Sequence, residues 1–169
     1  MHGYILTKGI TGSNKRGGMP AGSTLISMCT FDVDTPHDPG HHAITQSRVW
    51  GLVHVRMIVD EAAYAYYQAL IDKDHTDKSK PLEVELGFYR ANQVEVGIHG
   101  KGESAPFYKI NLKDARIVNL HFKMEDVRDS AKGGGGMLAE YLEMDVIFRE
   151  ITGTYAEGGK TWNDKWDAK

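Results

Sequence analysis

The fold is decided by the stretch LEVELGFY at positions 82–89, where apolar and charged side chains alternate. Its two leucines, its valine and its phenylalanine fall on one side of an extended chain, whereas Glu83 and Glu85 fall on the other. Successive side chains of a strand point to opposite faces of a sheet, so this period of two is typical of a half-buried strand. The stretch therefore predicts a strand with one face in a core.

The same period recurs on both sides of this stretch. Further apolar faces are predicted for Val53, Val55, Met57 and Val59, for Val118, Leu120, Phe122 and Met124, and for Leu142, Met144, Val146 and Phe148. Shorter strand candidates are Gly3–Lys8, Thr24–Val33 and Pro106–Leu112. The pattern predicts a mainly β protein. With 169 residues and no internal repeat, we expect a single domain over residues 1–169.

One segment departs from this alternation and predicts an α-helix over residues 60–72. Asp60 suits the N-cap, and the alanines that follow favour a helix. The apolar positions Ala63, Tyr67, Leu70 and Ile71 form the predicted buried stripe, with Tyr64 beside it. We expect this single helix to flank the β-structure.

The charge and the apolar runs exclude several classes of protein. The chain has 20 Lys+Arg against 23 Asp+Glu, so it lacks the basic excess that drives nucleic-acid binding. The sequence contains no apolar run of the ~20 residues that cross a bilayer, which predicts no membrane insertion. Residues 1–8 lack the features of a cleavable signal peptide, so we expect synthesis in the cytoplasm and export, if any, by another route.

The residues also favour a non-enzymatic protein without a metal or cofactor. The best metal candidate is the set Asp34, His37, Asp38, His41 and His42. Pro36, Pro39 and Gly40 oppose the helix that would bring two of these imidazoles to one face, so we predict no zinc site. The glycine-rich segment 97–104 lacks the Walker spacing, and Cys29 is predicted to be a buried structural thiol.

The second half of the chain contains a set of short motifs: a strand that ends in Phe88-Tyr89-Arg90, the segment 107–117, Phe148-Arg149 followed by Ile151, and the terminal Asp164 and Trp166. In this order, the motifs resemble those of the hemolysin-coregulated (Hcp) family of type VI secretion tube proteins. Family members often carry a tryptophan where this chain has Gly153. Many also have an acidic, His-containing stretch that residues 13–22 do not reproduce.

This resemblance implies a compact β-barrel of two packed antiparallel or mixed sheets with one flanking helix. It also implies a structural subunit that forms homohexameric rings, which stack into a tube. A contractile sheath surrounds such a tube, a VgrG-type spike protein caps it, and small effectors travel in its lumen. The segment 34–47 corresponds to an extended loop that reaches a neighbouring ring. Its candidate stacking residues are Asp34, His37, His41, His42, Ile44 and Gln46.

Two alternatives remain open at the level of the sequence. A tube protein of a phage tail, or of a phage-derived injection particle, shares the same barrel plan. A monomeric barrel that binds a small ligand or acts as an enzyme belongs to a different class, and it predicts a pocket in place of an assembly surface.

Overall fold

The computed structural model describes residues 2–14, 18–38, 40, 43–44, 48–71, 81–90, 105–124 and 140–165. Its elements are, in chain order, β1 His2–Thr7, β2 Thr24–Thr30, β3 Val33–Asp34, β4 His37–Asp38, β5 Ala43–Ile44, β6 Val49–Trp50, β7 Val53–Ile58, α1 Ala62–Ile71, β8 Leu82–Tyr89, β9 Tyr108–Lys123, β10 Tyr141–Ile147, β11 Glu150–Tyr155 and β12 Lys160–Lys165.

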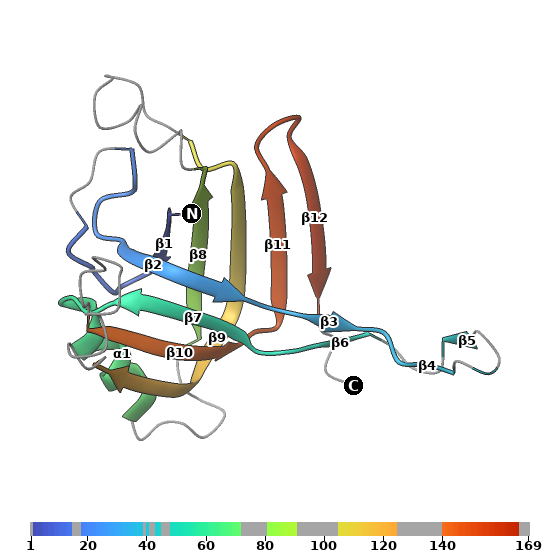
Figure 1. Cartoon of the computed structure of the whole chain (residues 1–169), viewed down its shortest axis with the longest axis horizontal. Helices are drawn as coiled ribbons and strands as arrows, with labels where there is room; N and C mark the ends of the chain where they lie inside the picture. Colours follow the sequence, from blue (N-terminus) through green and yellow to red (C-terminus); the bar gives the residue numbers. More distant parts are fainter. Residues whose placement is uncertain are drawn as a thin grey trace, which may run out of the picture.

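Six of these strands form a closed antiparallel barrel (Figure 1). Their order is β10-β7-β2-β1-β8-β9, and a pairing of β9 with β10 completes the circle. The predicted mainly β barrel with one helix is confirmed, and its two walls belong to one continuous sheet. β11 and β12 continue the sheet from β9 as a two-stranded ribbon outside the barrel, hereafter the ribbon.

The barrel interior is filled by the apolar faces that the alternation predicts. Val84 and Leu86 of β8 are buried, and their neighbours in the core are Val53, Val55, Met57, Leu142, Met144 and Val146. Val118, Phe122 and Met124 depart from the prediction, since they are 45%, 51% and 72% exposed. The β9–β10 register shifts at Val118, between Ile117 and Asn119, so Ile117 is buried and Val118 is exposed.

β9 joins the two walls of the barrel. The sequence predicts separate strands at 106–112 and 118–124, but the structure has one strand of 16 residues. Its first half pairs with β8 and β11, and its second half pairs with β10. Between the halves, Asp114 adopts a φ of 49°, and the register against β8 shifts. Such an irregularity bends a strand, and here it carries the chain from one wall to the other.

The helix begins as predicted, and three of the four predicted stripe positions, Ala63, Tyr67 and Leu70, pack partly buried against the core. Asp60 Oδ1 accepts a hydrogen bond from the Ala62 amide at 3.0 Å, which is the expected N-cap contact. The buried residues of α1 are Ala62 and Tyr66, while Tyr64 is 72% exposed, so its predicted place in the core was wrong. Ile71, also predicted in the stripe, is 62% exposed. At its inner position, the Tyr66 hydroxyl pairs with Thr7 Oγ1 at 3.0 Å.

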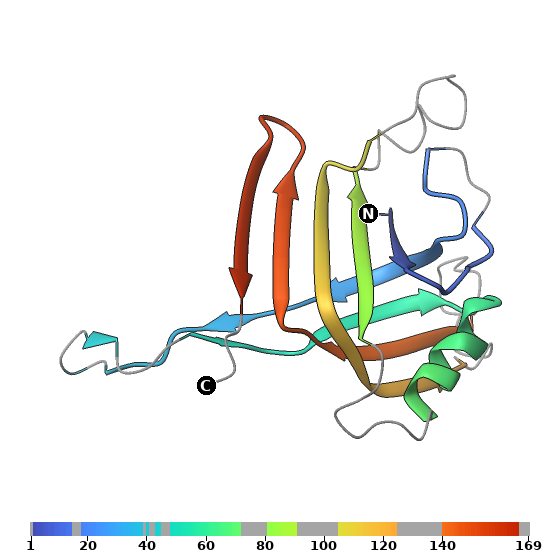
Figure 2. The same cartoon turned by 180° about the vertical axis from the view of Figure 1, so that it is seen from behind.

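A narrow extension leaves the barrel between β2 and β7. The short pairs β3–β6 and β4–β5 continue these two barrel strands outward (Figures 1 and 2). We call the segment of residues 33–50, which includes the strands β3 to β6, the arm. The sequence predicts a loop at 34–47, whereas the structure forms short antiparallel ladders within it.

Candidate assembly site at the base of the arm

The arm carries the residues that the sequence predicts for stacking. Asp34 is exposed in β3, opposite Val49 of β6. The backbones of His37 and Ile44 are partners in the β4–β5 pair. His41, His42 and Gln46 lie outside the described residues. The structure thus brings three of the six predicted positions into one extended hairpin.

Trp50 in β6 is the centre of an aromatic cluster at the base of the arm. Its ring is nearly parallel to that of Trp162 in β12, with centroids 5.8 Å apart and an interplanar angle of 5°. Phe148 meets the Trp50 ring edge-on at 5.8 Å, and Phe31 lies at 6.4 Å. The stacked arrangement with Trp162 and the edge-on arrangement with Phe148 are favourable geometries for aromatic pairs. The cluster therefore joins the arm to the ribbon.

Asp164 adds a charged contact beside this cluster. Its carboxylate accepts from Arg48 Nε at 2.5 Å and Nη2 at 2.6 Å, and from Trp50 Nε1 at 2.7 Å. The Arg48 guanidinium, followed by the Trp50 indole, lowers the Asp164 pKa to about 2 against the opposing effect of desolvation. The side chain of Asp164 is only 14% exposed, so this bidentate ion pair is partly shielded from water.

The ring of Trp162 fits because the strand beside it lacks a side chain. Gly153 of β11 is the register partner of Trp162, and a Cβ at this glycine would approach the indole ring to 2.3 Å. Trp162 Nε1 also donates to the Tyr108 hydroxyl at 2.9 Å. The indole thus occupies the place where a side chain at position 153 would lie.

The family-motif positions divide between the barrel and this site. Tyr89 is buried and donates to the Gly18 carbonyl at 2.7 Å, and burial raises its pKa to about 12. Arg90 pairs with Glu157 at 2.8 Å. Among the other motif positions, Phe88 packs partly buried on the core, Ile151 is buried and Arg149 is exposed. Phe148 and Asp164 each contact Trp50 at the arm base, and Trp166 lies outside the described residues.

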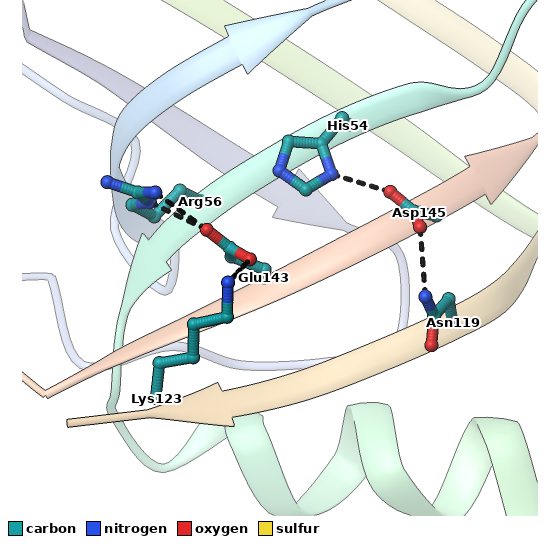
Figure 3. A network of polar contacts seen from close by, with 6 residues as sticks. All are labelled: His54, Arg56, Asn119, Lys123, Glu143 and Asp145. Carbon is teal, nitrogen blue, oxygen red and sulfur yellow. Dashed lines mark hydrogen bonds and ion pairs between the residues drawn. The ribbon is translucent and has the colours of Figure 1, made fainter.

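A second polar network covers the outer face of β7, β10 and β9 (Figure 3). Glu143 accepts from Lys123 Nζ at 2.6 Å and from Arg56 Nη2 at 2.7 Å. These two contacts, Lys123 first, lower its pKa to about 2. Beside it, Asp145 contacts His54 Nδ1 at 2.6 Å and Asn119 at 3.1 Å. The network ties three strands together on the side opposite the core.

Metal-ligating side chains and the single cysteine are the features of the described residues that bear on catalysis. Within these residues, no group of three or more His, Cys, Asp or Glu side chains is placed to hold a metal ion. Cys29 is largely buried, and desolvation raises its pKa to about 12, so it is a poor nucleophile. None of the helices in this part of the chain is long and apolar enough to cross a membrane.

Of the residues that join the arm to the ribbon, the sequence singled out Asp164 but missed its partners and the tryptophan stack. Arg48, Trp50 and Trp162 belong to no local motif, and Arg48 is separated from Asp164 by 116 positions. Glu143 and Asp145 are assigned to the correct face by the alternation, but alternation does not identify their partners. Only knowledge of which strands are neighbours reveals either network.

Known proteins were compared with this chain at the level of sequence and structure. The family profile described as "Type VI secretion system effector, Hcp" matches residues 4–155. A search of curated protein sequences found no match.

Solved structures resemble the chain over almost its whole length. The Hcp1 protein from E. coli (pathovar EAEC 042) shares 16% identity at a TM-score of 0.73, with 98% of this chain and 99% of that chain covered. The secreted protein Hcp3 from Pseudomonas aeruginosa shares 18% identity at a TM-score of 0.63, with 99% of each chain covered. A type VI secretion system effector from Yersinia pestis shares 13% at 0.64, with 98% and 99% covered. At these identities the structural likeness supports the shared fold.

Proposed function

Because the chain belongs to the Hcp family of type VI secretion system proteins, we propose that it forms hexameric rings that stack into the ejected inner tube. The family consists of structural secreted tube proteins and not of enzymes. The observation that carries the proposal is the family match over residues 4–155. The arm supports the stacking step, because it continues β2 and β7 beyond the barrel (Figure 1). It therefore presents a surface for another subunit away from the barrel.

The proposed partners follow from this role. The chain binds copies of itself within a ring and between rings, and it contacts a contractile sheath and a VgrG-type spike protein. Small effectors are carried in the lumen. We propose that the protein assembles in the cytoplasm as one domain and leaves the cell when the apparatus fires, without binding nucleic acid or inserting into a membrane.

The packed interior of the barrel disfavours the alternative in which the barrel binds a small ligand. Buried side chains from all six barrel strands and from α1 occupy the interior, which leaves the barrel centre as a packed core. A tube of a phage-derived injection particle has the same mechanical role as the proposed function, and genome context distinguishes the two.

Light scattering on the purified protein tests the ring. We expect a species of about six times 18.8 kDa, and stacked rings by electron microscopy at high concentration. A protein that stays strictly monomeric throughout the micromolar range contradicts the proposal.

A further inference from the structure

The arm joins the barrel through a break in the strand ladder. Residues 31–32 and 51–52 belong to no strand, so the barrel pair β2–β7 and the arm pair β3–β6 are separate ladders. One backbone hydrogen bond crosses the break, from the Gly51 amide to the Asp32 carbonyl at 3.0 Å. A Cβ at Gly51 would come within 2.1 Å of the Asp32 carboxylate, so the two segments of the chain lie close together here. At this break, no continuous strand ladder fixes the direction of the arm relative to the barrel.

Side chains from β12 span this break from outside the barrel. Trp162 stacks on Trp50, and Asp164 binds Arg48, so both contacts lie on the arm side of the break. A stacked ring pair restrains tilt about the plane of the rings. A two-pronged guanidinium–carboxylate pair restrains direction, because both of its hydrogen bonds must stay in line. Together they hold the arm at a defined angle.

β12 has little other packing to explain these contacts. Five of its six residues are exposed, and Asp164 is the exception. Within the described residues, its ladder partner is β11 alone, so it has no part in closing the barrel. The inward contacts of β12 are with the arm base and with Tyr108 and Gly153 beneath the Trp162 ring.

We propose that Trp162 and Asp164 are positioning residues: the ribbon sets the direction in which the arm leaves the barrel, and ring stacking depends on that direction. The inference rests on the proposed function for its assembly step only. An arm that pivots must lose this freedom when it docks, and ordering mobile groups on binding weakens association. Fixing the arm beforehand removes that loss.

The direct test measures the direction of the arm in solution. Spin labels are placed at Thr35→Cys on the arm and His121→Cys on the barrel, in a Cys29→Ala background, and the distance distribution is recorded at concentrations below ring formation. We expect one narrow distribution in the parent. Trp162→Ala and Asp164→Asn should each broaden it, and Arg48→Gln should do the same from the arm side. Thr161→Ala, the exposed neighbour on β12, is the matched control and should leave the distribution narrow.

A second readout separates positioning from folding. The stacked Trp50–Trp162 pair should give a coupled band in the near-ultraviolet circular dichroism that Trp162→Ala removes and Trp162→Phe alters, while the far-ultraviolet spectrum stays unchanged. Ring mass should be unaffected, whereas the concentration needed for stacking should rise roughly tenfold or more in Trp162→Ala, with partial rescue in Trp162→Phe, whose ring retains the stack.

The distance measurement and the stacking measurement test the inference, whereas ring formation by the parent tests the proposed function. Distributions that stay narrow in all three variants overturn the inference, and so does unchanged stacking in variants whose distributions have broadened. If the parent forms neither rings nor tubes, the proposed function fails, while the distance measurement on the monomer still tests whether the ribbon directs the arm.

Discussion

The barrel and the arm use the same antiparallel ladder but are held in place by different forces. Every barrel strand has a neighbour on both sides, and the barrel encloses residues such as Val53 and Leu86 that have no exposed surface. The described part of the arm consists of the strand pairs β3–β6 and β4–β5, and exposed apolar residues such as Val33 and Val49 lie on it. Burial thus stabilises the barrel, while one aromatic and ionic cluster holds the arm. The difference separates the part of the chain that carries the fold from the part that we propose for assembly.

The largest expected effect lies in the barrel interior. Leu86→Ala should lower the free energy of unfolding by about 3 kcal/mol, because it leaves a cavity in a packed core. Urea titration followed by circular dichroism measures the change. Leu52→Ala, at a residue 45% exposed near the arm base, is the control and should cost less than about 1 kcal/mol. Equal losses at both sites would remove the distinction between the two regions.

An intermediate effect is expected at the outer face of the barrel. Glu143→Gln should lower the free energy of unfolding by about 2 kcal/mol near neutral pH, because Arg56 and Lys123 lose a largely buried carboxylate. Glu83→Gln removes the exposed pair with Lys8 and should change stability by less than about 0.5 kcal/mol.

The pH dependence of this difference gives a sharper test. The Glu143 pKa is lowered to about 2 in the fold, whereas a glutamate in an unfolded chain titrates near ~4.3. The stabilisation is therefore complete above the unfolded pKa and is lost as the pH falls toward 2. The gap between the parent and Glu143→Gln should narrow between about pH 5 and pH 2. A gap that stays constant over this range would show that the charge is not its source.

The smallest effect on stability, and the largest on assembly, is expected in the arm. Replacing residues 37–45 with a short Gly-Ser linker leaves the barrel strands untouched, so the free energy of unfolding should change by less than about 0.5 kcal/mol. Tube formation should be lost. Unfolding of the variant would place the arm in the core. Normal tubes would move the stacking contact elsewhere, with residues 12–18 and 133–136 as the next candidates.

Local patterns in the sequence predict the barrel better than they predict the site. The alternation at 82–89 gives β8 with its bounds, and Asp60 marks the start of the helix, because both depend on neighbours in the chain. The face of α1 was predicted less well. Tyr66 and Tyr67 are the same residue type, and the contact of Tyr66 with the distant Thr7 hydroxyl cannot be read from the local pattern.

The bend in β9 and the arm base escape prediction for a related reason. A strand that changes partners at Asp114 looks like two strands in a sequence, because its alternation is interrupted there. The contacts of Trp50 and Asp164 depend on the ribbon lying beside the arm, which no local period encodes. A resemblance to known tube proteins indicates the role of the chain, but it does not identify these contacts.

The closed strand order also has a consequence for the chain while it is being synthesised. A growing chain that has reached residue 58 contains β1, β2 and β7, which are neighbours in the sheet and form a three-stranded unit with two open edges. The edge of β1 is covered only when β8 has been made, and the edge of β7 only when β10 has been made. Open edges invite pairing with other chains. The interval between synthesis of Ile58 and synthesis of Ile147 is therefore the period in which a nascent subunit most needs protection from its own copies.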